Sequence, residues 1–149
     1  MLLTVDIGNT NITLGVFEGK KLRTTFRMTT IQTRTSDEYG MVMCELLEHN
    51  QVKVEEITDV IVASVVPNVM HSLTSAIIKY FHTRPIIIEA GVKTGIRVAS
   101  KNPRQVGADR IVDAAAAYEI YGGPVLVLDF GTATTYDLVD ATGAFVSGV

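Results

Sequence analysis

Two short segments, each an aspartate followed by a glycine and small polar residues, are best suited to chemistry. The first is Asp6-Ile7-Gly8-Asn9-Thr10-Asn11-Ile12-Thr13, and the second, 123 residues further along, is Asp129-Phe130-Gly131-Thr132-Ala133-Thr134. Glycine lets backbone N–H groups approach an anion closely, and Asn and Thr side chains add hydrogen-bond donors. A carboxylate can hold a cation, or the water around it, against that anion. The pair predicts a site for phosphates and their metal, formed by two loops that face each other.

The two segments share one form, which indicates an internal repeat. In each, three mostly apolar residues precede the aspartate, an apolar residue and a glycine follow it, and hydroxyl or amide side chains come next. After each comes a run that could pair back as a β-hairpin, residues 12–17 in the first copy and 135–139 in the second. Both copies also place a carboxylate at the end of a strand that we expect to be buried, where an unpaired charge is costly. The repeat therefore predicts two structural units of the same kind.

Strands and helices must hold these loops in place, and the spacing of apolar residues predicts both. An antiparallel meander is expected first, and helices alternating with strands then add a parallel extension to it. The predicted strands are residues 2–5, 12–17, 22–28, 59–66, 85–89, 125–128, 135–139 and 144–149. The predicted helices are residues 37–50, capped by Ser36, 69–82 and 106–121, and residues 91–105 are predicted to be an irregular loop. The fold class is therefore α/β, with a mixed sheet flanked by helices.

Composition is that of a soluble globular protein and argues against several classes of function. Of the 149 residues 47% are hydrophobic and 19% are charged, the formal net charge is -3, and the 13 basic residues are scattered. Nucleic acid is not expected as a partner, because its phosphates would demand a basic surface. No apolar segment approaches the roughly 20 residues that cross a bilayer, and no signal-peptide pattern opens the chain. The single cysteine, Cys44, fits a reducing compartment, so we expect a cytoplasmic protein without membrane partners.

Five segments follow one another along nearly the whole chain. They are Asp6-Ile7-Gly8-Asn9-Thr10-Asn11, Ser64-Val65-Val66-Pro67, Asn102-Pro103, Gly107-Ala108-Asp109-Arg110 and Asp129-Phe130-Gly131-Thr132-Ala133-Thr134. Together they resemble type III pantothenate kinase, of the acetate and sugar kinase, heat-shock-protein-70 and actin superfamily. The resemblance implies ribonuclease-H-like domains, as in actin-like ATPases; we expect the first at residues 1–123 and the opening hairpin and sheet of a second at 124–149. It also implies ATP-dependent phosphorylation of pantothenate to 4'-phosphopantothenate, the first step of coenzyme A biosynthesis.

The resemblance also implies roles for individual residues. The residues that would bind ATP are Asp6, Ile7, Gly8, Asn9, Thr10, Asn11, Ile12, Thr13 and Thr132. Those that would contact pantothenate are Gly107, Ala108, Asp109, Arg110 and Ser100, with Asp109 serving as the base. Asp129 would bind a monovalent cation, potassium or ammonium. Members of the family are homodimers whose active site includes residues of both subunits, so a homodimer is expected.

Elementary chemistry is consistent with these roles. Phosphoryl transfer to a primary alcohol needs a hydroxyl held in line, an acceptor for its proton, and cations that offset charge on the transferring group. Asp109, at the start of a predicted helix, could accept the proton, and Asp6 could orient water bound to Mg2+. Arg110 could pair with the carboxylate of pantothenate. Purely structural interpretations stay open, with Asp109 as a partner of the helix dipole and Asp6 and Asp129 as turn formers.

Two features depart from the family pattern. An aromatic residue, usually tyrosine, commonly stands two positions before the Asn-Pro pair, where this chain has Ser100. This serine puts pantothenate affinity and substrate identity in question. The second hairpin is also followed by only one further predicted strand, so the chain is expected to span one domain and the opening sheet of the next. Such a sheet would leave exposed edges and apolar surface, and activity is not expected unless other chains complete it.

Two other functions stay open at this point. One is a non-catalytic accessory or regulatory relative of the same family, although the presence of Asp6, Asp109 and Asp129 together favours a kinase. The other is a ribonuclease-H-like nuclease, in which clustered carboxylates hold two metal ions. A nuclease would explain the meander and Asp6, but it requires a glutamate on the first helix facing the aspartates, such as Glu45 or Glu48, and a basic surface.

Overall fold

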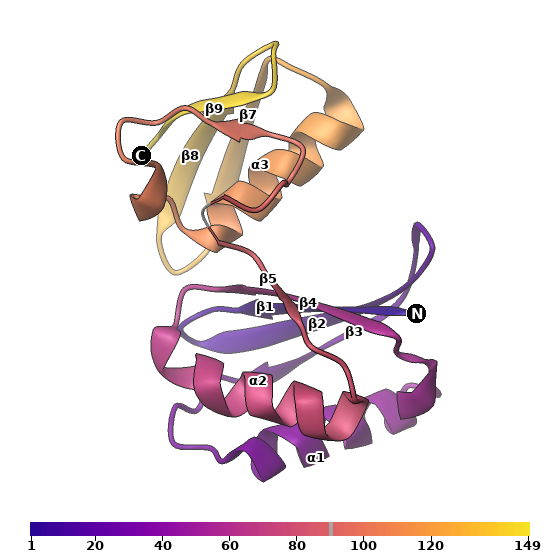
Figure 1. The fold of residues 1–149 in the computed structure, drawn as a ribbon. Coiled ribbons are helices and arrows are strands. Elements are labelled where there is room, and N and C mark those ends of the chain that lie inside the picture. The colour runs from indigo at the N-terminus through magenta and orange to yellow at the C-terminus, as the bar shows by residue number, and fades with distance from the viewer. Residues whose placement is uncertain (90) are drawn as a thin grey trace. The chain divides into compact units, whose positions relative to one another are not determined.

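The computed structural model describes residues 1–89 and 91–149, which form two compact units, Met1–Ile87 and Ile88–Val149 (Figure 1). The first unit is a five-stranded sheet in the order β3-β2-β1-β4-β5 with two long helices on one face. Its elements are β1 (Leu2–Ile7), β2 (Asn11–Glu18), β3 (Lys21–Thr29), α1 (Ser36–His49), η1 (Val54–Glu56), β4 (Asp59–Ser64), α2 (Pro67–Phe81) and β5 (Ile86–Ile87). Strands β1 to β3 pair antiparallel, whereas β4 and β5 extend the sheet in parallel. The predicted meander with a parallel extension is confirmed.

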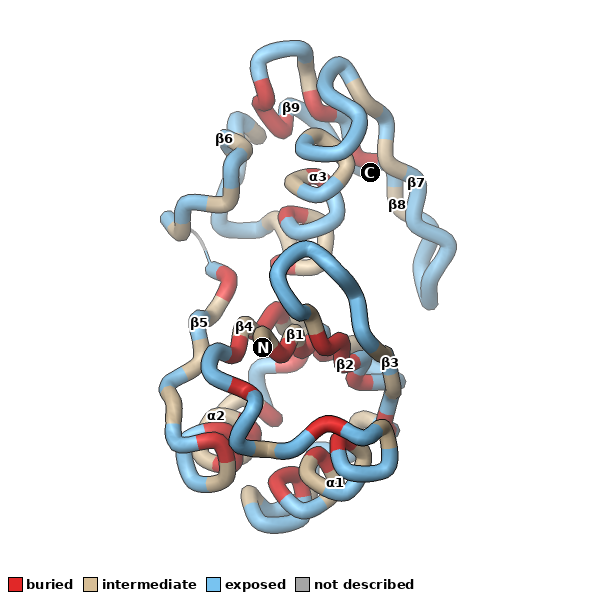
Figure 2. The backbone as a smooth tube through the Cα atoms, turned by 90° about the vertical axis from the view of Figure 1, so that its right-hand side faces the viewer, coloured by how far each residue is buried: buried red, intermediate tan, exposed pale blue. Residues whose placement is uncertain are grey.

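Alternation of apolar residues along β1 and β2 decides which face of this sheet the helices cover. The fully buried side chains of the two strands lie opposite one another, and they are Leu3, Val5, Ile7, Ile12, Leu14 and Val16. They share one core with the apolar faces of α1 and α2 (Figure 2). Asp6 lies between Val5 and Ile7, so its side chain belongs to the opposite face, where it is exposed. The expected burial of this strand is therefore confined to one face, and the Asp6 carboxylate lies on the other.

Helix α1 begins one residue earlier than the sequence predicts, and a different residue caps it. The side chain of Thr35 accepts a hydrogen bond from the backbone N of Glu38, and the Glu38 carboxylate accepts one in return from the backbone N of Thr35. Such a capping box needs Glu or Gln three positions after the cap, a condition that Thr35 meets and Ser36 does not. The predicted Ser36 cap is therefore wrong.

The second unit is a four-stranded sheet in the order β6-β9-β8-β7, with one long helix. Its elements are β6 (Arg97–Val98), η2 (Pro103–Gln105), α3 (Ala108–Tyr121), β7 (Val125–Phe130), β8 (Thr134–Val139) and β9 (Ala144–Gly148). Ala114 of α3 packs with Val139 and Phe145 in a small core. The other face of β7 carries Leu126, Leu128 and Phe130, which are 55%, 45% and 79% exposed. The predicted exposed apolar surface is confirmed for this strand, which is pale blue along much of its length in Figure 2.

The two repeated hairpins pair in registers that differ by one residue. The last paired residues are Ile7 and Ile12 in the first hairpin but Phe130 and Thr134 in the second. The second loop is therefore one residue shorter than the first. A slip of one residue exchanges the faces of a strand. The β7 residues that correspond to the buried Leu3, Val5 and Ile7 are therefore the exposed ones. Both copies are hairpins, as predicted. Their first strands bury different faces, whereas Asp137 and Val139 of β8 are buried like the corresponding Leu14 and Val16 of β2.

The division into compact units falls ahead of the predicted boundary at residues 123 and 124. The reason is that α3 contacts β7 and β8, with which it forms the second unit. Assignment of residues 1–123 to one ribonuclease-H-like domain stays a prediction. Residues 91–105, predicted to be an irregular loop, contain the short β6 and η2. No helix in the described ranges has the length and apolar character needed to cross a membrane.

Candidate functional site

The loop that follows Asp6 is closed by hydrogen bonds to its own backbone and to the end of β3. The backbone N of Gly8 donates to the carbonyl of Asn11 at 2.9 Å, and the Thr30 hydroxyl donates to the carbonyl of Gly8 at 2.7 Å. The backbone N of Thr30 donates to the carbonyl of Thr10 at 2.9 Å. Asn9 and Thr10 are exposed at the tip. The loop is thus a braced turn that presents small polar residues to solvent.

The two loop glycines differ in what the fold demands of them. A Cβ atom at Gly8 would lie 3.1 Å from the carbonyl oxygen of Asn11, inside the hydrogen bond that closes the loop. A Cβ atom at Gly131 would meet nothing nearer than a carboxylate oxygen of Asp129 at 3.5 Å, which is ordinary van der Waals contact. Neither residue has a positive φ angle. Folding therefore accounts for Gly8, whereas Gly131 has no structural reason within the described residues.

Asp129 lies opposite Thr135 in the β7–β8 pair, and both are oxygen ligands of the kind that hard cations prefer. Directly opposed side chains in an antiparallel pair share one face of the sheet. The Thr135 hydroxyl is buried and finds no hydrogen-bond partner in the described part of the chain. The unpartnered hydroxyl and the exposed carboxylate are two oxygen groups that could hold a cation. Thr132, the other predicted contact of this loop, is exposed at its tip.

Asp109 occupies the first turn of α3, immediately after the buried Ala108 and the N-cap Gly107. Its side chain is half-buried, and its Oδ1 accepts a hydrogen bond of 2.9 Å from the backbone N of Arg110. A carboxylate here satisfies one of the free N–H groups at a helix start and complements the helix dipole. Among the described residues no hydrogen bond to Oδ2 is found, so one oxygen can serve a ligand.

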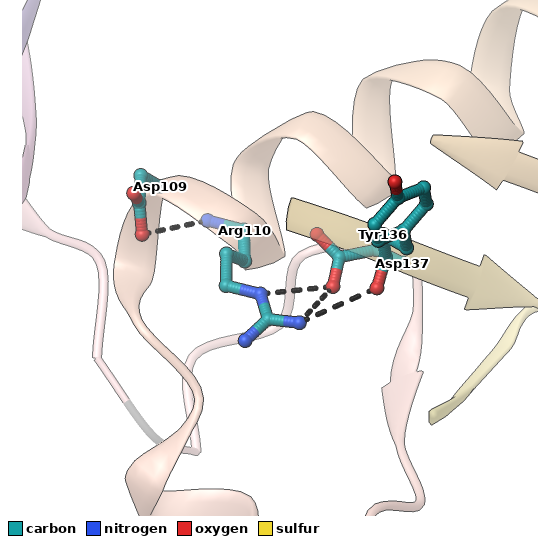
Figure 3. A network of polar contacts seen from close by, with 4 residues as sticks. All are labelled: Asp109, Arg110, Tyr136 and Asp137. Atoms are coloured by element: carbon teal, nitrogen blue, oxygen red, sulfur yellow. Dashed lines mark hydrogen bonds and ion pairs between the residues drawn. The ribbon is translucent and has the colours of Figure 1, made fainter. Parts of the chain in front are cut away.

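Arg110 is bound to a residue that sequence reasoning missed. Its Nε donates to Oδ1 of Asp137 at 2.8 Å, its Nη2 forms an ion pair with the same oxygen, and Nη2 also donates to the carbonyl of Tyr136 at 3.5 Å (Figure 3). Asp137, on β8, is 1% exposed. Arg110, which we expect to face a substrate carboxylate, thus uses the Nε and Nη2 side of its guanidinium to bind Asp137 within the protein.

A signal for Asp137 was present in the sequence. Thr135, Asp137 and Val139 alternate along the predicted second strand of the hairpin, so an apolar core position at 139 places the Asp137 side chain on the inner face. A buried carboxylate needs a cationic partner. The identity of that partner could not be read, because Arg110 lies 27 residues away on another element.

Ser100 and Arg110 line one polar pocket of about 360 Å³ in the second unit. Asn102, Ser147 and Phe145 contribute to the same walls. The Ser100 hydroxyl is buried and has no hydrogen-bond partner among the described residues. Two residues predicted to contact one substrate therefore line the same pocket.

The first helix does not offer the glutamate that a nuclease site would need. Glu45 and Glu48 lie on α1, which packs on the face of the sheet formed by Val5 and Ile7. Asp6 points to the opposite face, so the sheet separates it from both glutamates. Within the described residues no group of three or more His, Cys, Asp or Glu side chains could hold a metal ion.

Comparison with known proteins gives one family and one fold. A family model described as type III pantothenate kinase matches residues 2–149. A curated protein of Agathobacter rectalis, named type III pantothenate kinase, is 64% identical over 149 residues, which are 100% of this chain and 57% of that protein. The chain thus spans little more than half the length of this relative.

Two solved structures resemble the chain in fold. The ethanolamine utilization protein EutJ from Carboxydothermus hydrogenoformans matches with a TM-score of 0.55 and 14% identity, over 99% of this chain and 50% of its own. A candidate N-acetylglucosamine kinase from Porphyromonas gingivalis matches with a TM-score of 0.53 and 17% identity, over 95% and 45%. At such identities the likeness concerns the fold alone, and it confirms the predicted α/β class of the actin-like ATPases, with a mixed sheet flanked by helices.

Proposed function

Because this chain belongs to the type III pantothenate kinase family, we propose that its protein phosphorylates pantothenate with ATP to give 4'-phosphopantothenate, the first step of coenzyme A biosynthesis. The observation that carries the proposal is the family match over residues 2–149, together with 64% identity to a relative of that name. Since the chain spans 57% of that relative, the activity of the whole protein is part of the proposal.

Asp109 is the proposed general base. The hydroxyl oxygen of pantothenate attacks the γ-phosphorus of ATP, the bond from that phosphorus to the β–γ bridging oxygen breaks, and ADP leaves. The hydroxyl proton passes to the Asp109 carboxylate. Its half-buried position and its single hydrogen bond, to the backbone N of Arg110, support this role, because one oxygen stays available to the hydroxyl.

ATP is proposed to bind the loop from Asp6 to Thr13 and the second loop at Thr132. Exposed amide and hydroxyl groups of Asn9 and Thr10 support the first contact. The open space at Gly131 supports the second, since a bare backbone lets phosphate oxygens approach closely. We further propose that Asp6 orients water of an ATP-bound Mg2+ and that Asp129 and Thr135 hold K+ or NH4+. Bound cations offset negative charge on the phosphoryl group in transfer.

Pantothenate is proposed to lie against Gly107, Ala108, Asp109 and Arg110, with Ser100 in the adjoining pocket. The pocket that Ser100 and Arg110 both line supports this placement. Ser100 stands where the family commonly has an aromatic ring, so this wall lacks that ring. A cytoplasmic homodimer whose subunits share the active site, without nucleic-acid or membrane partners, completes the proposal.

A chimera tests the proposal directly. In it, residues 1–149 replace the matching segment of the Agathobacter rectalis relative, so that the rest of the relative's length is supplied. With ATP, Mg2+ and K+ we expect mass spectrometry to detect 4'-phosphopantothenate. Asp109→Asn should lower kcat about 100-fold or more, because the hydroxyl proton loses its acceptor.

Asp113→Asn is the matched control, a carboxylate one turn further along α3 that has no proposed part in the reaction. It should leave kcat near that of the unsubstituted chimera. No product from a folded, potassium-containing preparation would refute the kinase and favour the non-catalytic accessory relative.

A further inference from the structure

Asp137 is the buried charged residue of the described structure, at 1% exposure. It lies on the side of β8 that faces α3, between Thr135 and the core residue Val139. In the repeat it corresponds to Leu14, which is fully buried in the first hairpin. At such a position an apolar residue generally stabilises the fold at least as much as a buried ion pair does. Stability alone therefore gives no reason for a carboxylate here.

The partner of this carboxylate is Arg110, which it holds by one edge. Nε and Nη2 both donate to Oδ1 of Asp137, and the third nitrogen, Nη1, points away from Asp137 in Figure 3. The guanidinium also lies over the Phe145 ring, 6.0 Å from its centroid. The arginine side chain keeps 24% exposure and reaches the pocket that Ser100 also lines. The Nε–Nη2 edge of the guanidinium is thus fixed by Asp137, while Nη1 is available to a ligand.

Gly148 on β9 makes room for this ion pair. A Cβ atom at position 148 would overlap both the Arg110 guanidinium and the Asp137 carboxylate. The backbone of Gly148 is not in the left-handed region, so its conformation does not require glycine. Space beside the pair is what position 148 must provide. Residues of α3, β8 and β9 therefore combine in one arrangement.

We propose that Asp137 is a positioning residue for substrate recognition, and that Gly148 permits it to act. Resting on the proposed function, the inference is that Asp137 fixes the Nε–Nη2 edge of Arg110 and so aims Nη1 at the carboxylate of pantothenate in the pocket. A planar guanidinium held by one edge loses little further freedom when its other edge binds an anion. Pantothenate binding then depends on a residue that does not touch it.

The test compares Asp137→Asn with the unsubstituted chimera. The amide keeps the shape of the carboxylate but not its charge, so its hydrogen bonds to Arg110 are weaker. The KM for pantothenate should rise about 10-fold, which corresponds to about 1.4 kcal/mol. The KM for ATP should stay within about twofold, and so should the KM for the neutral alcohol analogue of pantothenate, whose carboxylate is reduced to hydroxymethyl.

Electrostatics alone predicts the opposite sign. If Asp137 merely neutralised Arg110, its removal would free a positive charge and lower the KM for pantothenate. An unchanged or lowered KM in Asp137→Asn therefore overturns the positioning role. Gly148→Ala is the second variant, and it should raise the same KM by displacing the pair while every charge is kept. If Asp137→Asn does not fold, Gly148→Ala decides alone.

Val139→Ala is the matched structural control, two residues further along β8. It removes core volume and should lower the melting temperature while the KM for pantothenate stays within about twofold. If Val139→Ala raises that KM as much as the two variants do, general loosening of the unit explains the effect and the positioning role fails. Turnover by the unsubstituted chimera separates the two proposals, because its absence would refute the proposed function itself.

Discussion

Gly8 and Gly131 stand at corresponding places in the two hairpins but have different surroundings. The space at Gly8 is closed by the Asn11 carbonyl, while the space at Gly131 is open. We expect Gly8→Ala to cost about 1–3 kcal/mol of unfolding free energy, because the turn must shift to admit a methyl group. Gly131→Ala should leave the melting temperature unchanged or slightly higher and should raise the KM for ATP in the chimera. Equal destabilisation by both substitutions would contradict this distinction.

Cys44 offers a second test at the level of one side chain. Burial raises the pKa of its thiol, and the nearby Glu48 and Glu55 carboxylates raise it further. Because the thiolate is the reactive form, a raised pKa leaves less of it at pH 8. We expect iodoacetamide to modify Cys44 more slowly in the native chain than in urea. Equal rates, followed by mass spectrometry, would show that the native thiol is accessible and ordinary.

At the scale of elements, a polar contact joins α1 to α2. Asp37 accepts hydrogen bonds from Lys79 Nζ at 2.6 Å and from the Tyr80 hydroxyl at 2.8 Å, and these bonds lower the pKa of Asp37. The same bonds raise the pKa of Lys79 and that of Tyr80. Close by, a Cβ atom at Gly40 would overlap the Tyr80 ring, so the two helices approach closely.

The sign of the pH dependence follows from these directions. A lowered pKa at Asp37 means that its contribution is present above the unfolded value of 3.8 and is lost as the pH falls through the lower folded value. Asp37→Asn should therefore lower the melting temperature at pH 7, and the difference should vanish in strong acid. Glu45→Gln, an exposed position on the same helix, is the control and should change little. A difference that persists in strong acid would show that charge at Asp37 is not the cause.

Elements with strong local signals were predictable, and those that depend on distant partners were not. The three long helices and the strands of both hairpins follow from apolar spacing. The strand predicted at residues 85–89 is present as the shorter β5, whereas the two-residue strand β6 lies in the predicted loop and exists only through pairing, as Arg97 with Ala144 shows. The contact between Arg110 and Asp137 is equally non-local, so the sequence places Asp109 and Arg110 at the start of a helix but does not reveal the ion pair of the arginine.

At the scale of the whole molecule, one face of β7 exposes large apolar side chains, Leu126, Leu128 and Phe130, to solvent. Leu128 is 45% exposed, whereas its repeat counterpart Val5 is 2% exposed. Leu128→Lys should leave the melting temperature nearly unchanged and reduce self-association, measured by sedimentation at high protein concentration. Val5→Lys should abolish cooperative unfolding of the first unit, because it buries an unpaired charge. Strong destabilisation by Leu128→Lys would mean that the β7 face is covered in solution.

The earlier closure of the second hairpin loop also limits how the two loops can be exchanged in protein engineering. A graft that carries the longer closure of the first loop into the second hairpin would shift β8 by one residue against β7. Such a shift would pair Asp137 with Leu128, as Leu14 pairs with Val5 in the first hairpin, in place of its present partner Val127. Two loops that look interchangeable in an alignment are thus not interchangeable parts, since loop length decides which face of β7 shares a side of the sheet with Asp137.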